Sequence, residues 1–106
     1  MRLLADFTAR PGREADVARL LADYAEHVRA EPGNIAFDAY SVQNDAVRFV
    51  VHEIYRDEAA FADHLSAPQN AAFNASLTAF IVEQATRSTM LDSVPIRTTG
   101  KNQDRS

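Results

Sequence analysis

The sequence predicts one α+β domain with the element order β-α-β-β-α-β around an antiparallel sheet. Short runs repeat apolar residues with the period of a strand, and longer runs space them as a helix does. Pro-Gly and Asn-Asp pairs separate these runs. The length of 106 residues suits a single domain. We expect that domain to span residues 1–94, and the polar, unpatterned residues 95–106 to form a disordered tail.

The first half of the domain is predicted to be a strand over residues 2–9 followed by a helix over residues 13–30. In the strand, Leu3, Ala5 and Phe7 recur at every second position. The helix has apolar residues at helical spacing, namely Val17, Leu20, Leu21, Tyr24 and Val28. Pro32-Gly33 ends it, because proline lacks the N–H that a helix needs.

Two further strands, over residues 34–43 and 46–56, are expected to form a hairpin joined at Asn44-Asp45. In this register Phe37 faces His52 and Tyr40 faces Phe49. One sheet face then carries Ile35, Phe37, Ala39, Val50, His52 and Ile54. The other carries Ala36, Asp38, Tyr40, Val42, Val47, Phe49, Val51, Glu53 and Tyr55.

Both predicted sheet faces are mainly apolar, whereas a sheet with one solvated face alternates cleanly between apolar and polar residues. The helices of the chain can cover only one face. Packing against an identical sheet would cover the other, so we expect a homodimer. The alternative is that the valines and tyrosines of one face are simply exposed. In the dimer, Asp38 and Glu53 are expected to lie at the interface and hold it in register, and the alternative is that they act as acid and base.

The second half of the domain supplies two short helical segments and a last strand. Asp57-Glu58 places acidic side chains at a helix start, where they suit the helix dipole. The first segment carries Phe61 and Leu65 inward, and the second carries Phe73, Leu77, Phe80 and Ile81. A strand over residues 86–94 completes the order of a ferredoxin-like fold.

The composition excludes several classes of function. The chain has no cysteine, so disulfides, thiolate metal sites and cysteine nucleophiles are ruled out. A net charge of −4 argues against a nucleic-acid surface. No apolar run is long enough for a membrane span, and no signal peptide is evident, so we expect a cytoplasmic protein. No two histidines have a metal-binding spacing, so no metal site is expected.

Several strings of the chain, in their order and spacing, point to a known family. AEPGN at residues 30–34 leads into FDAY at residues 37–40, and FVVHEIYRDEAAF follows at residues 49–61. His64, Pro68 and Phe73 come next. Together they resemble the antibiotic biosynthesis monooxygenase (ABM) family, including its quinol monooxygenase-like members, over about residues 1–94.

The resemblance implies a dimeric α/β barrel of ferredoxin-like protomers, each with its own pocket. It also implies an enzyme that oxidises a small hydroxylated aromatic or quinol with molecular oxygen and no cofactor. One position departs from the pattern. Many relatives have a histidine early in the last helical segment, where this chain has Gln69. A mechanism that depends on that histidine cannot be carried over.

Two histidines are candidate catalytic bases. His64 follows Phe61 by three positions, so it borders the apolar side of its helix, and it matches a family histidine. His52 lies mid-strand among apolar residues, where it is either a base lining the pocket or a hydrogen-bonded core histidine. His27, beside charged neighbours near a helix end, is expected to be solvated.

Candidate substrate-binding residues are Asn34, Tyr55, Asn74, Phe73 and Phe37. The amides and the phenol are expected to orient the substrate, although turn chemistry or packing would explain them equally well. Two other functions are kept open. One is an isomerase acting on a small carbonyl metabolite, and the other is a non-catalytic, small-molecule-binding dimer.

Overall fold

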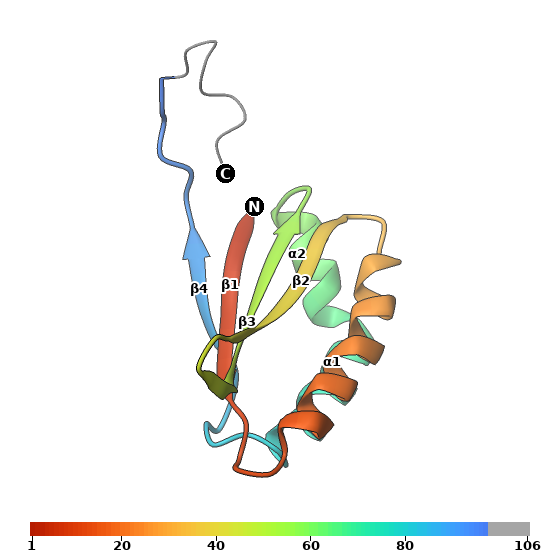
Figure 1. Ribbon diagram of the computed structural model, residues 1–106. Coiled ribbons are helices and arrows are strands. Elements are labelled where there is room, and N and C mark those ends of the chain that lie inside the picture. The colour runs from red at the N-terminus through yellow and green to blue at the C-terminus, as the bar shows by residue number, and fades with distance from the viewer. Residues whose placement is uncertain (98–106) are drawn as a thin grey trace.

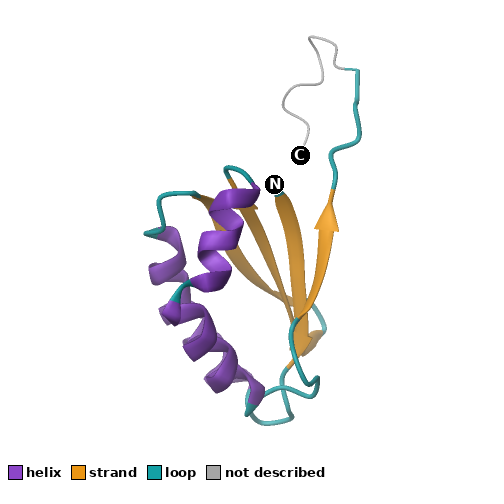
Figure 2. Cartoon of the chain, turned by 180° about the vertical axis from the view of Figure 1, so that it is seen from behind, coloured by secondary structure: helices purple, strands orange, loops and turns teal. Residues whose placement is uncertain are grey.

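The computed structural model describes residues 1–97 and has seven regular elements. They are β1 (Arg2–Thr8), α1 (Glu14–Arg29), β2 (Asn34–Val42), β3 (Asp45–Tyr55), α2 (Glu58–Ser66), α3 (Pro68–Thr78) and β4 (Arg87–Leu91). The strands form one antiparallel sheet in the order β2-β3-β1-β4, and the three helices cover one of its faces (Figures 1 and 2). The predicted ferredoxin-like α+β fold is confirmed.

The hydrophobic core fills the space between the helices and the inner sheet face. Alternate residues of β1 and β3 point into it, as a strand's period of two requires. The buried apolar residues are Leu3, Ala5, Phe7, Ala9, Val17, Leu21, Tyr24, Val28, Phe37, Phe49, Val51, Tyr55, Ala60, Leu77 and Ile81.

Local capping fixes where the two short helices begin. Asp57 caps α2, because its side chain accepts a hydrogen bond from the Ala60 N–H at 2.8 Å. Pro68 opens α3, at a position where its missing N–H costs nothing. These two starts make α2 and α3 consecutive helices on the same side of the sheet, with only Ala67 between them (Figure 2).

The register of the β2–β3 hairpin differs by one residue from the sequence prediction. The turn is Gln43-Asn44, with Asn44 at a φ of 65°, and Val42 pairs with Asp45. A register shift between Ser41 and Val42 then sets the rest of the hairpin. A slip of one residue moves every paired side chain of a strand to the opposite face. Each predicted face list was therefore wrong, because it joined one face of β2 to the opposite face of β3.

The observed β2–β3 register determines which side chains face the helices. Phe37 pairs with Glu53 rather than His52, and His52 pairs with Asp38. Phe37 and Glu53 are both buried. They share the inner face, whereas His52 and Asp38 share the outer one. The prediction that Glu53 is an interface residue beside Asp38 was therefore wrong.

The last strand is shorter than the sequence predicts. β4 covers Arg87–Leu91 rather than residues 86–94. Residues 92–97 have no regular secondary structure. The predicted disordered tail lies mostly outside the described residues. None of the helices within residues 1–97 combines the length and the apolar character that crossing a membrane requires.

Candidate functional site

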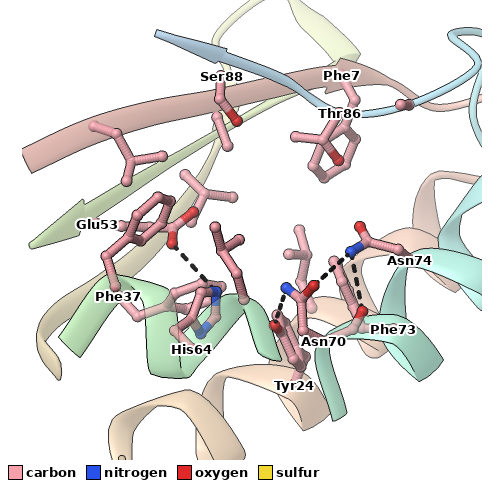
Figure 3. A pocket seen from close by; sticks show the side chains of 17 residues that line it. Phe7, Tyr24, Phe37, Glu53, His64, Asn70, Phe73, Asn74, Thr86 and Ser88 are labelled. Carbon is pink, nitrogen blue, oxygen red and sulfur yellow. Dashed lines mark hydrogen bonds and ion pairs between the residues drawn. The ribbon is translucent and has the colours of Figure 1, made fainter. Parts of the chain in front are cut away.

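A cavity of about 260 Å³ lies between the inner sheet face and the three helices (Figure 3). Its size suits a small molecule, since it falls just below the range of about 300–1,000 Å³ for drug-sized ligands. Most of its wall is apolar and comes from Leu3, Ala5, Phe7, Leu21, Phe37, Val51, Phe61, Leu65, Phe73 and Ala85. Its polar groups come from Tyr24, Glu53, His64, Asn70, Asn74, Thr86 and Ser88.

His64 is the histidine of this cavity, and its ring is held from one side. The residue is 4% exposed, and its Nδ1 lies 2.9 Å from Glu31 Oε1 and 3.2 Å from Oε2. A carboxylate only accepts hydrogen bonds, so Nδ1 carries the proton and donates it. In the neutral ring, Nε2 is then the unprotonated nitrogen. It lies 3.9 Å from Glu53 Oε1, which is too long for a hydrogen bond, so its lone pair remains free for a molecule in the cavity.

Glu53 is a buried carboxyl next to that nitrogen. The Tyr55 hydroxyl donates to Glu53 Oε1 at 2.7 Å. Burial raises the pKa of Glu53 above its ordinary value, and this outweighs the Tyr55 hydrogen bond and His64, which both favour the charged form. Burial and the adjacent Glu53 carboxyl raise the pKa of Tyr55 well above its usual range. The Glu53 carboxyl therefore favours its protonated form more than an exposed carboxyl does, and Tyr55 stays a neutral phenol.

The raised pKa of Glu53 predicts a pH dependence of stability. The folded protein binds this proton more tightly than the unfolded chain, whose carboxyl titrates near 4.5. The stabilisation is therefore complete below that value and is lost as the pH rises through the folded-state pKa. Glu53→Gln keeps an acceptor for Tyr55 but cannot titrate. Its unfolding free energy, measured in urea, should gain on that of the wild type as the pH rises above 4.5. An unchanging difference between the two proteins would contradict the shift.

The opposite end of the cavity carries a chain of amides (Figure 3). Asn70 Nδ2 donates to the Tyr24 hydroxyl at 3.0 Å, and Asn74 Nδ2 lies 3.2 Å from Asn70 Oδ1 and 3.0 Å from the Asn70 carbonyl. Tyr24 stacks on Phe73 with ring centroids 4.0 Å apart. Burial raises the pKa of Tyr24 to about 12, so it stays a neutral phenol. The cavity thus has two polar ends, one with acid–base groups and one with neutral hydrogen-bonding groups.

The structure brings together part of the site predicted from the sequence. His64, Asn74, Phe73 and Phe37 line the cavity. Tyr55 lies behind Glu53, which it orients.

The other two candidates lie elsewhere. Asn34 donates to the Ala36 carbonyl at 3.0 Å within its own strand and does not line the cavity. His52 lies on the outer sheet face, where its Nε2 is 3.5 Å from Arg2 Nη1. The placement of His52 beside Phe37 followed from the slipped register and was wrong.

Three residues of the site are not among the catalytic and substrate-binding candidates predicted from the sequence. Glu53 stands at alternate positions with Val51 and Tyr55, a pattern that would have placed it inside had the hairpin register been known. Tyr24 matched the core pattern of its helix, and nothing local distinguishes it from a packing residue. Glu31 lies in the helix-ending AEPGN string, and its contact with a side chain 33 residues away leaves no local signal.

Within residues 1–97, no group of His, Cys, Asp or Glu side chains is arranged to hold a metal ion. The protein defined by this fold and site is a ferredoxin-like domain with an internal, largely apolar cavity and a buried histidine between two carboxyls. The sequence model described as antibiotic biosynthesis monooxygenase matches residues 1–76. The chain belongs to that family, whose members are typically dimeric.

Solved structures share the fold of this chain. An antibiotic biosynthesis monooxygenase is 24% identical, with 89% of this chain and 98% of that chain covered and a TM-score of 0.81. The protein PA3566 from Pseudomonas aeruginosa is 26% identical, with 89% and 93% covered and a TM-score of 0.80. Rv0793 from Mycobacterium tuberculosis is 23% identical, with 92% and 97% covered and a TM-score of 0.80. No curated protein matches the chain.

Proposed function

We propose that this protein is a cofactor-independent monooxygenase that oxidises a small hydroxylated aromatic or quinol with molecular oxygen. The observation that carries the proposal is the free Nε2 of His64, a base in an apolar cavity sized for a small molecule. Family membership supports the same reaction class.

The chemistry begins with a proton transfer. His64 Nε2 takes the proton of a substrate hydroxyl, and the resulting anion is electron-rich enough to pass an electron to oxygen. In the balanced reaction, a quinol and O₂ give a hydroxyquinone and water, so one oxygen atom enters the ring and the quinol supplies the electrons. The apolar walls keep bulk water away from the anion, and the amides at the far end orient a second oxygen of the substrate.

Oxygen uptake with a panel of hydroquinones and naphthols tests this proposal. The purified protein should consume oxygen with a hydroxylated substrate and give an oxygenated product. Saturable binding without turnover would instead favour a small-molecule-binding dimer.

A second candidate function follows from the proximity of Glu53 to His64. A base and a carboxyl inclined to hold a proton, 3.9 Å apart, are suited to moving a proton between two atoms of one substrate. That arrangement would serve an isomerase of a small carbonyl metabolite. Exchange of substrate hydrogen with deuterated water, without oxygen uptake, would identify this activity.

We also propose that the working protein is a homodimer formed through the outer sheet face. That face carries apolar side chains that no helix within residues 1–97 covers, among them Leu4, Val50 and Ile54. Tyr40 on the same face is 56% exposed. A second sheet packed against these residues would remove their apolar surface from water.

Ile54→Glu is expected to dissociate this dimer. The new carboxylate would be buried at the interface in the dimer but stands beside Arg2 in the protomer, so the isolated fold tolerates it. Light scattering during size-exclusion chromatography should show a dimer for the wild type and a monomer for the variant. Ala71→Glu changes an exposed side chain of α3, on the helix-covered side of the sheet, and should leave the dimer intact. A monomeric wild type at micromolar concentration would refute the proposal.

A further inference from the structure

The ring of His64 separates two cavities. Its inner side lines the 260 Å³ substrate cavity (Figure 3). Its other side lines a second cavity of about 120 Å³, which is formed with Glu31, Gly33, Arg56 and Asp63 among others. The ring is thus part of the wall of both cavities. One of its nitrogens, Nε2, lies toward Glu53, and the other, Nδ1, lies against Glu31 of the second cavity.

The two carboxyls beside His64 differ in their access to water. The Glu53 side chain is 9% exposed, and its Oε1 already accepts the Tyr55 hydroxyl. The Glu31 side chain is 23% exposed and lines the second cavity. A proton that reaches the imidazole therefore has a route outward through Glu31, whereas the Glu53 side is closed.

We propose that Glu31 is a positioning and proton-relay residue that acts through His64. It fixes the ring so that Nε2 faces the substrate, and it receives the proton from Nδ1. The inference rests on the proposed function for the role of His64 as base. When Nε2 gains the substrate proton, an N–H bond forms there. The Nδ1–H bond then breaks, an O–H bond forms on Glu31, and the carboxyl passes that proton to water. The Nε2 proton later goes to the oxygen that is released as water, and Nδ1 takes a proton back from water through Glu31, which restores the base. No electrons change hands in these transfers.

Three substitutions at Glu31 separate positioning from relay. Glu31→Gln keeps an oxygen that accepts from Nδ1–H but cannot take up a proton, so it should hold the ring and block the relay. Glu31→Leu removes both roles, and Glu31→Asp restores the carboxylate on a shorter side chain. Asp63→Asn is the matched control, because Asp63 lines the same second cavity, whereas the ring nitrogens pair with Glu31 and Glu53.

The first readout is independent of turnover. Nitrogen-15 NMR of the His64 ring should show the proton on Nδ1 in the wild type, Glu31→Gln and Asp63→Asn, and a mixture of both tautomers in Glu31→Leu. Exchange of the Nδ1 proton with solvent should be slower in Glu31→Gln than in the wild type. An unchanged tautomer in Glu31→Leu would overturn the positioning role, and unchanged exchange in Glu31→Gln would overturn the relay.

The second readout is turnover with a substrate found by oxygen uptake. In Glu31→Gln we expect kcat to fall on the order of 10²-fold while KM stays within about two-fold, and Glu31→Asp should recover most of the loss. Wild-type kcat in Glu31→Gln would overturn the relay. If no substrate is oxidised by the wild type, the proposed function fails, while the tautomer and exchange measurements still decide the role of Glu31.

Discussion

His64→Gln is expected to lower kcat for oxygen-dependent oxidation by about 10²–10⁴-fold, the usual contribution of a general base. Glutamine has a similar reach, and its amide can still donate to Glu31, so the side chain remains anchored. It has no basic nitrogen to take the substrate proton at Nε2. Oxygen-electrode kinetics over a range of substrate concentrations would measure the loss, and the unfolding midpoint would show that the variant is folded.

The control for this experiment is His52→Gln. His52 lies on the outer sheet face, away from the cavity, so its replacement should leave kcat within about two-fold of the wild type. The sequence alone made the two histidines comparable candidates, and the structure separates them. Equal losses in the two variants, or full activity in His64→Gln, would contradict the assignment of the base.

Gly33→Ala is expected to destabilise the protein by about 1–3 kcal/mol, the usual cost of inserting a methyl group into a packed interior. A Cβ at position 33 would clash with the Cβ of Ala60 and would lie 3.3 Å from the Ala60 Cα. The clash cannot be relieved by a side-chain rotation, because the closest atoms are the Cα and Cβ of Ala60, which are fixed by helix α2. Urea unfolding would measure the change.

Ala60→Gly provides the rescue that identifies the cause. It removes the clashing Cβ, at a cost of about 1 kcal/mol for glycine in a helix. The double variant should therefore be more stable than the sum of the two single changes predicts. Gly12→Ala is the comparison, because position 12 has a φ of +84° but open space around it, so its strain should not be relieved by Ala60→Gly. Strict additivity of Gly33→Ala and Ala60→Gly would contradict the close contact.

The same close contact links stability to the site. Gly33 lies between Glu31 and β2, and Ala60 lies one turn before His64 on α2. The absence of a side chain at position 33 lets α2 approach closely enough for His64 to reach Glu31 at 2.9 Å. Gly33→Ala should therefore also weaken the hold on the His64 ring.

The order of elements was predictable because it depends on local patterns. Apolar spacing marked α1, and Pro32-Gly33 marked its end, so α1 was placed within one residue at each end. The hairpin register was not predictable in this way. It depends on a register shift between Ser41 and Val42 that the residue types do not indicate.

That single-residue slip accounts for much of what the sequence missed in the site. It exchanged the faces of His52 and Glu53 relative to Phe37, so an outer-face residue was a candidate base and an inner-face carboxyl was assigned to an interface. His64 was placed correctly at the apolar side of its helix because that inference needed only helical spacing. The contact of His64 with Glu31 is long-range, and only the folded chain reveals it.

Insertion of oxygen into a hydroxylated aromatic, with His64 as the base, is tested most directly with oxygen-18 gas. A quinol identified by oxygen uptake would be incubated with the protein under labelled oxygen, and the product analysed by mass spectrometry. We expect one labelled atom in the hydroxyquinone, the other in water, and little product from His64→Gln. An unlabelled quinone with hydrogen peroxide in equal amount, or labelling that persists in His64→Gln, would contradict it.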